Sequence, residues 1–336
     1  MRRGAETVVF EQPPTAAELE EASGRGVLLS ELIAGVRDVY SPDVFDDVVN
    51  LLGCLRHALG AEQWEYAGVP LWDTVVCDFH WRYLDPVFRH VDAAEQLLDT
   101  LRARSQPARR PWQIAFVGAG SAFARVLTKV AHSQGLSVAG DHDRRDVPRA
   151  ALRACAVPYL AHLRDCLRTV GVRARPLGTR RPVVLLNHAW RNFEVVEPAL
   201  RELQHRLSSD DVVVVQTSPD GQHEIEQAGF ACRPYDHYVS PIGGLRALIG
   251  AAPVIRFLTS GRWKARASAE HVTWRGTPIA ALAEHEISVG LARLIGNMMR
   301  ELACARTVLV RERPAVVVTT EDRSTSTRAM AFSARA

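Results

Sequence analysis

Residues 114–125 read Ile-Ala-Phe-Val-Gly-Ala-Gly-Ser-Ala-Phe-Ala-Arg, and residues 316–328 read Val-Val-Val-Thr-Thr-Glu-Asp-Arg-Ser-Thr-Ser-Thr-Arg. Each stretch begins as a buried strand would and continues through a short turn to a Ser, with an Arg four residues later. A strand that leads at once into a Ser and a helix is how α/β proteins present backbone N–H groups to an anionic ligand. The sequence therefore predicts two strand–turn–helix units, each with a potential anion site.

A second motif precedes both stretches. Tyr66-Ala-Gly-Val-Pro-Leu and Trp274-Arg-Gly-Thr-Pro-Ile share the pattern aromatic-x-Gly-x-Pro-aliphatic, and a helical stretch separates each from its strand. Two explanations remain open. The chain contains a duplicated α/β module, or the common order helix–strand–helix recurs by chance.

Composition places the chain among ordinary globular proteins. A length of 336 residues predicts about two domains, and 47% hydrophobic with 24% charged residues is typical of the class. The net charge of +3 gives no reason to expect nucleic-acid binding. The six cysteines are scattered, and no Cys or His cluster has zinc spacing, so we expect reduced thiols and no metal site. The sequence shows neither a signal peptide nor an apolar run of membrane-spanning length, which predicts a cytoplasmic protein.

The order of predicted elements indicates an α/β fold. We expect a helix-rich domain over residues 1–170 with a βαβ unit at 113–139, a basic linker at 171–181, and an α/β domain over 182–336. Strands alternating with helices predict two Rossmann-like modules with parallel sheets. We also expect a long helix over about 148–169, strands at 183–186 and 212–216, and irregular structure over 238–276.

Three segments of the second domain match a known family in order. Asn187-His-Ala-Trp-Arg-Asn-Phe-Glu follows the strand at 183–186, Asp220-Gly-Gln-His-Glu follows the strand at 212–216, and Arg313-Pro leads a strand into residues 320–327, Thr-Glu-Asp-Arg-Ser-Thr-Ser-Thr. With these segments the domain, residues 182–336, resembles the amino-terminal half of the UDP-N-acetylglucosamine 2-epimerase family. That family shares the GT-B architecture with many glycosyltransferases, which have similar Arg/Glu, Gly-Gln-His and Asp-x-x-Ser/Thr turns.

The resemblance implies a nucleotide-sugar-dependent enzyme of GT-B type. Such an enzyme, if active here, transfers or epimerises a sugar in glycan or secondary-metabolite biosynthesis and takes a UDP-sugar donor. In this sequence Asp322 takes the place of the acid/base or sugar ligand, and Ser324 with Arg328 is placed to hold phosphate or hydroxyl groups. His188, Arg191 and His223 would line the opposite wall. The further residues implied for catalysis or substrate binding are Glu194, Gln222 and Arg323.

The chain also departs from the family. Glu321 stands where the family has a glycine before the aspartate, and the stretch 238–276 is an unusual insertion. The carboxy-terminal domain, which carries most nucleotide contacts in that architecture, does not follow residue 336. We therefore expect a truncated form, or a partner that supplies the missing domain, either a second chain or another copy. A non-catalytic α/β scaffold protein is a further alternative.

The residues can also be read without the family. Asp322 follows a strand at the edge where open α/β sheets bind ligands, but it could equally cap the next helix. Arg328 could reach a phosphate or lie exposed on the surface. A histidine in a loop, such as His188, is often a surface residue without a catalytic role. The expectation that loops from three strands converge on one sheet edge is stronger than any single residue.

A second function is suggested by Gly118-Ala-Gly120 in the first domain. These glycines lie between a strand and a helix, and Asp141 follows Gly118 by 23 residues, near where a ribose-binding acid stands in dinucleotide-binding folds. Phe123 stands where that fingerprint has its third glycine. The alternative is therefore an NAD(P)-dependent enzyme whose cofactor contacts also include Ser121 and Arg125.

Overall fold

The structure, a computed structural model of residues 1–336, contains two compact units. Unit 1 comprises Met1–Gly60, Asp78–Ala150 and Ser260–Ser288, and unit 2 comprises Ala61–Cys77, Ala151–Thr259 and Val289–Ala336. The structure describes residues 7–10, 12–22, 26–34, 42–104, 112–117, 121–136, 138–139, 157, 160, 164, 183–187, 190–207, 212–217, 222–238, 240–319 and 324–335.

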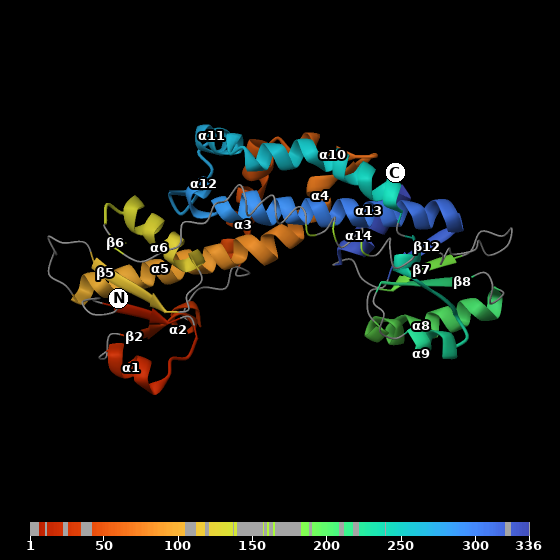
Figure 1. Ribbon diagram of the computed structural model, residues 1–336, viewed down its shortest axis with the longest axis horizontal. Helices are drawn as coiled ribbons and strands as arrows, with labels where there is room; N and C mark the ends of the chain where they lie inside the picture. The colour runs from red at the N-terminus through yellow and green to blue at the C-terminus, as the bar shows by residue number, and fades with distance from the viewer. Residues whose placement is uncertain are drawn as a thin grey trace. The chain divides into compact units, whose positions relative to one another are not determined.

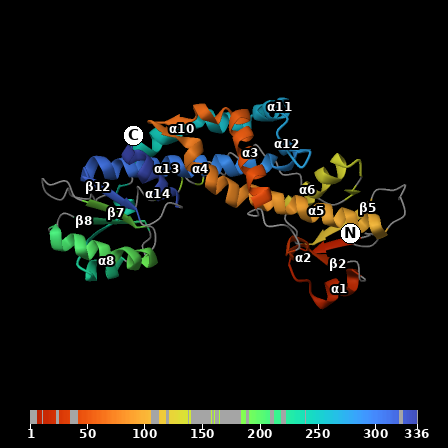
Figure 2. The same cartoon turned by 180° about the vertical axis from the view of Figure 1, so that it is seen from behind.

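A parallel sheet forms one end of unit 1, in the order β2-β1-β5-β6. The register pairs Thr7 with Ile114 and Phe10 with Val117, so β1 and β5 end together at their carboxyl ends. Helix α6 lies above this sheet and α1 below it in both views (Figures 1 and 2). The bounds are β1 Thr7–Phe10, α1 Ala16–Ala22, β2 Gly26–Leu28, α2 Leu29–Ala34, β5 Trp112–Val117, α6 Ser121–Ser133 and β6 Val138–Ala139.

Unit 2 holds a second parallel sheet, in the order β12-β7-β8-β9. All five residues of β8 are buried, as expected for an apolar run at the centre of a parallel sheet. Helix α8 lies on one side of the sheet and α13 on the other in both views (Figures 1 and 2). The bounds are β7 Val183–Asn187, α8 Trp190–Arg206, β8 Val212–Gln216, α9 Gln222–Gln227, β9 Ala231–Pro234, η4 Tyr235–Tyr238, α13 Ala292–Glu312, β12 Val316–Thr319 and α14 Thr325–Arg335.

The succession of elements is the same in the two halves of the chain. A helix, a two-stranded hairpin, a short helix, a π-helical turn and a long helix precede the strand that returns beside the first strand of each sheet. In the first half these are α3 Pro42–Leu59, η1 Ala61–Gln63, β3 Glu65–Tyr66, β4 Val69–Pro70, α4 Leu71–Phe79, η2 His80–Leu84 and α5 Asp85–Arg104. In the second half they are α10 Pro241–Thr259, α11 Arg262–Ala269, β10 Thr273–Trp274, β11 Thr277–Pro278, α12 Ile279–Leu282, η5 Glu286–Leu291 and α13.

The two hairpins explain the aromatic-x-Gly-x-Pro motif. Both residues of each turn have positive φ: 54° at Ala67 and 83° at Gly68, 47° at Arg275 and 77° at Gly276. Two consecutive residues with positive φ are what a type I′ turn requires, and Gly adopts the second position without strain. The shared backbone geometry, together with the shared element order, supports a duplicated module.

Several sequence-based predictions of elements need correction. The stretch 238–276 was expected to be irregular, but it contains α10 and α11. Strand β9 was not predicted, and α8 begins at Trp190, earlier than the helix expected there. The helix expected at 148–169 and the linker at 171–181 fall largely or wholly outside the described residues. The predicted domains were continuous in sequence. In the structure, Ala61–Cys77 from the first half of the chain belongs to unit 2, and Ser260–Ser288 from the second half belongs to unit 1.

Helix α10 has the composition of a membrane span. It is the one helix in the described part of the chain that is long and apolar enough to cross a bilayer. Its most apolar 18-residue stretch has a mean hydropathy of 1.4, and 22% of that stretch is buried. Core helices of soluble proteins can meet the same criterion, and α10 packs against α13 within unit 2. Its composition alone is therefore weak evidence for a membrane.

Candidate functional site

The carboxyl edge of the sheet in unit 2 is the candidate functional site. From β7 the chain continues through α8 to β8 and then through α9 to β9, while β12 lies on the other side of β7. Leu186 pairs with Thr319, so β7 and β12 end side by side. In open parallel sheets, ligands bind outside the carboxyl ends of the strands at the point where the strand order reverses, as it does between β7 and β12 here.

The connections that follow three strands all begin at this edge, because the strands are parallel. The connection from β7 to α8 carries His188 and leads to Arg191, and the connection from β8 leads to Gln222 and His223 at the start of α9. The connection from β12 to α14 carries Asp322 in the sequence. The topology therefore assigns all three predicted motifs to one edge of one sheet, although His188, Asp322 and Arg323 lie outside the described residues.

The strands themselves bring polar residues to this edge. Asn187 is the last residue of β7 and pairs with Gln216, the last residue of β8. Gln216 is 2% exposed, which makes it a polar side chain at the end of an otherwise apolar buried strand. Thr319 ends β12 beside them.

Ser324 caps helix α14. Its Oγ accepts the backbone N–H of Thr327 at 3.2 Å and lies 2.6 Å from the Oγ1 of Thr327, and its carbonyl accepts the backbone N–H of Arg328 at 3.1 Å. This is the bonding of an N-cap residue. The capping role that the sequence left open for Asp322 is thus filled by Ser324. Arg328, one turn into α14, is partly buried.

The polar residues at the start of α9 bond within that helix. Gln222 Nε2 donates to Glu226 Oε1 at 2.9 Å, and His223 is exposed with its Nε2 2.7 Å from Gln227 Nε2. Glu194 is exposed on α8, and only the backbone of Arg191 is described. The hydrogen bonds given for Gln222 and His223 are therefore made within α9.

The carboxyl edge of the sheet in unit 1 carries the other predicted anion site. Ser121 begins α6 directly after the turn with Gly118 and Gly120, which lies outside the described residues, as does Asp141. The side chain of Arg125 forms an ion pair, in which its Nη2 donates a hydrogen bond to Glu286 Oε1 at 3.0 Å. The side chains of Arg125 and Glu286 are 27% and 11% exposed, respectively. The guanidinium predicted to contact a dinucleotide cofactor is therefore paired with a carboxylate.

Burial sets the protonation of the groups around this ion pair. Burial, together with the smaller effect of the nearby positive charge of Arg125, lowers the pKa of His90 to about 4. Burial raises the pKa of Glu286, and Arg125 opposes that shift. Around neutral pH, His90 is a neutral side chain packed edge-on against Phe123, with ring centroids 5.6 Å apart.

Glu286 was not predicted as a site residue. It lies 161 residues from Arg125 in the sequence, at the start of the π-helical turn η5, in the part of that turn that belongs to unit 1. No local pattern signals such a partner. Only the exchange of Ser260–Ser288 into unit 1 brings it to α6.

Known proteins offer no further guide to this edge. Comparisons with protein-family models, curated proteins and solved structures give no match. Among the residues that the structure describes, no group of three or more His, Cys, Asp or Glu side chains is arranged to hold a metal ion.

Proposed function

We propose that this chain is a nucleotide-sugar-dependent enzyme of GT-B type that transfers or epimerises a sugar. The observation that carries the proposal is the reversal of strand order at β7, with β8 on one side and β12 on the other. Because these strands are parallel, three polar connections follow their carboxyl ends at one edge of the sheet. The motif resemblance of residues 182–336 supports the same assignment. In this proposal the sheet of unit 2 is the Rossmann-like module of the fold.

The proposed roles follow from the chemistry of each group. Asp322 acts as the acid/base or binds a sugar hydroxyl, since a carboxylate can accept or return a proton. Arg328 supplies positive charge for phosphate, to which Arg donates in a bidentate manner. The N-terminus of α14, already capped by Ser324, adds its positive dipole end. His188, Arg191 and His223 line the facing wall.

Ligand binding is the first test. A thermal-shift screen of the full chain against UDP-, GDP- and TDP-sugars should show a rise in melting temperature with one class of donor, because a ligand that binds only the native state stabilises it. NAD(H) belongs in the same screen, since the turn between β5 and α6 has the strand–turn–helix context of dinucleotide-binding folds. If NAD(H) raises the melting temperature and no nucleotide sugar does, the chain is instead an NAD(P)-dependent enzyme, as the alternative states.

Catalysis is tested by the substitution Asp322→Asn. Turnover of the donor found in the screen should fall by about 100-fold or more, as is typical when an acid/base group is removed, with an unchanged melting temperature. Glu202→Gln on the exposed surface of α8 is the matched control and should retain full turnover. Equal turnover in Asp322→Asn and wild type would contradict the proposed role of Asp322 in catalysis.

A further inference from the structure

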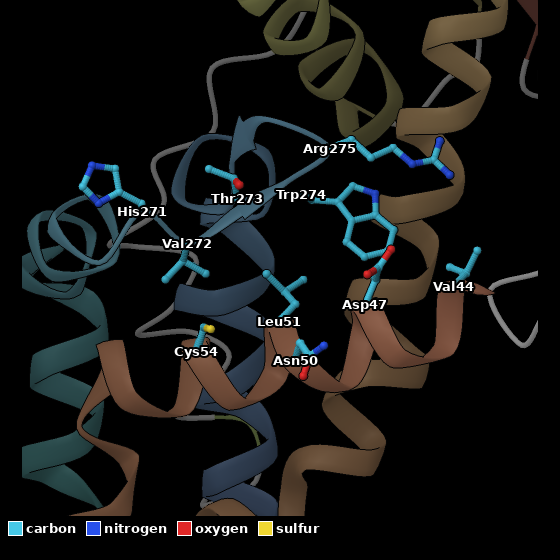
Figure 3. A pocket seen from close by; sticks show the side chains of 10 residues that line it. All are labelled: Val44, Asp47, Asn50, Leu51, Cys54, His271, Val272, Thr273, Trp274 and Arg275. Carbon is cyan, nitrogen blue, oxygen red and sulfur yellow. The ribbon is translucent and has the colours of Figure 1, made fainter. Parts of the chain in front are cut away.

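A pocket of about 340 Å³ opens in unit 1 between α3 and the start of the β10–β11 hairpin (Figure 3). From α3 it is lined by side chains that include Asp47, Asn50 and Cys54. The opposite wall is formed by residues 271–275, which lead into and form β10. Its size lies within the range of small-molecule sites, roughly 300–1,000 Å³.

The pocket's polar side chains are available to a ligand. Within the described part of the chain, no hydrogen bond or ion pair engages the side chains of Asp47, Asn50 or Thr273. Arg275 differs, because its guanidinium forms ion pairs with Asp92 and, at 3.3 Å, with Glu95. The carboxylate of Asp47, the amide of Asn50, the hydroxyl of Thr273 and the imidazole of His271 therefore remain, and the Arg among the described lining residues is already paired.

The rest of the lining is apolar and held in place. Val44, Leu51, Val272 and Trp274 are each less than a tenth exposed. The Trp274 ring stacks on Phe88 with centroids 4.1 Å apart and an interplanar angle of 21°. Planar hydrogen-bonding groups beside a fixed apolar wall suit a molecule that combines several hydroxyl groups with C–H surface.

The duplicated module offers an internal comparison. When Leu51 of α3 is matched with Ala251 of α10, four buried positions coincide: 44 with 244, 51 with 251, 55 with 255 and 58 with 258. The hairpins match Trp274 with Tyr66. The polar positions Asp47, Asn50 and Cys54 then correspond to Ala247, Gly250 and Val254.

The corresponding place in unit 2 is filled by protein. A Cβ added to Gly250 would lie 2.9 Å from Cδ2 of Tyr66 and 3.1 Å from Cε of Met299, so Tyr66 occupies the space that Asn50 faces in unit 1. The two copies share their backbone elements, but the polar positions that line the pocket in unit 1 are Ala247, Gly250 and Val254 in unit 2.

We propose that the pocket in unit 1 binds one small polyhydroxylated molecule, of the size of a monosaccharide, through hydrogen bonds to Asp47, Asn50 and Thr273. This site is separate from the carboxyl edge of the sheet in unit 2, and its proposal does not depend on the function proposed there. Asp47 makes the pocket acidic, which favours a neutral or amino-bearing ligand over a phosphorylated or carboxylated one.

The free thiol of Cys54 reports on occupancy of the pocket. In the full chain, iodoacetamide should alkylate Cys54, and D-glucose, N-acetyl-D-glucosamine or D-glucosamine should slow that reaction. A probe present at twice its Kd slows it about threefold, by mass action. Cys77 is a second exposed free thiol outside the lining, and its alkylation should not change. Cyclohexanol, with a similar ring but one hydroxyl, should protect neither thiol.

Two variants on α3 link protection to the proposed hydrogen bonds. Asp47→Asn should weaken protection by the best probe about 10-fold in Kd, since a hydrogen bond to a charged group contributes about 1.5 kcal/mol. Asp46→Asn, one position away, exposed and outside the lining, should keep the wild-type Kd. The proposal is overturned if no probe protects Cys54, if Cys54 and Cys77 are protected equally, or if both variants bind as wild type does.

Discussion

His90 is a histidine that its surroundings keep uncharged. It lies on α5 with its Nδ1 buried and without a hydrogen-bond partner in the described structure, and Arg125 adds a repelling positive charge. The pKa is about 4 in the folded protein, against an ordinary value of 6.5. Protonation of this ring is therefore much easier in the unfolded chain.

The stability of the protein should consequently fall as the pH falls from 6.5 to about 4. Over this range the unfolded state binds a proton that the folded His90 does not, so the unfolding free energy decreases by up to about 1.4 kcal/mol per pH unit. His90→Leu should reduce that slope. The measurement is urea denaturation at several pH values between 4 and 7.

The control is Val195→Ala, since Val195 is 79% exposed on α8 and carries no titratable group. That variant should show the wild-type slope. Glu286 has the opposite effect on stability, because its pKa is raised above 4.5 and the folded state therefore binds the extra proton just above that pH. The contribution of His90 is therefore taken from the difference in slope between His90→Leu and wild type. A slope unchanged in His90→Leu would contradict the assignment.

Individual residues were the hardest feature to predict from sequence. The spacing of Ser and Arg after each strand correctly indicated where helices begin, and Ser324 does cap α14. The partner of Arg125 could not be inferred, because Glu286 reaches it through tertiary structure. The pocket residue Asp47 carries no local motif, and its importance emerges only when the two copies are compared.

At the scale of elements, two helix glycines should respond oppositely to alanine. Gly250 in α10 faces Tyr66 at a distance that leaves no room for a Cβ, whereas a Cβ on Gly53 in α3 would meet nothing within 4 Å. Gly250→Ala should lower the unfolding free energy by about 1 kcal/mol or more through overpacking. Gly53→Ala should raise it by about 0.5–1 kcal/mol through helix propensity.

Chemical denaturation of both variants provides the measurement, and each is the control for the other. If Gly250→Ala stabilises the protein as much as Gly53→Ala does, the Tyr66 ring is not packed against α10. If the clash with Tyr66 is the cause, Gly250→Ala should cost less in the Tyr66→Ala background than in the wild type, because coupled neighbours are non-additive.

Elements with strong local signals were predicted well. Apolar runs identified β5, β7, β8 and β12. Helix α10 was missed because its sequence holds several glycines and an internal Pro253, which have low helix propensity. Packing against α13 overrides that propensity. Strand β9 was missed because Ala-Cys-Arg-Pro has no strand periodicity and lies at the sheet edge.

At the scale of the whole molecule, the fold class was predictable and the organisation was not. Alternating strands and helices indicate parallel sheets, and both sheets are parallel. The exchange of Ala61–Cys77 and Ser260–Ser288 has no local signal, since it depends on how the hairpins dock. Ser260–Ser288 is held in unit 1 by the stack of Trp274 on Phe88 and by the Arg125–Glu286 pair.

This exchange should make the two units unfold together. Trp274→Ala should cost about 3–5 kcal/mol, as is typical for a buried aromatic, and should lower the hydrogen-exchange protection of β1 in unit 1 and β8 in unit 2 by a similar factor. Trp81→Ala is the matched control, because Trp81 is 52% exposed, and should leave both protected. Loss of protection confined to β1 would show that the units unfold independently.

The exchanged segment also has a consequence for synthesis on the ribosome. The strands of the first sheet emerge early. Residues 260–288, which complete unit 1, can fold onto them only after Ser288 has left the exit tunnel. Until then the nascent polypeptide exposes the surface of α5 that later receives Trp274, a surface attractive to chaperones. Codon choice before position 260 would therefore set how long that exposed stage lasts.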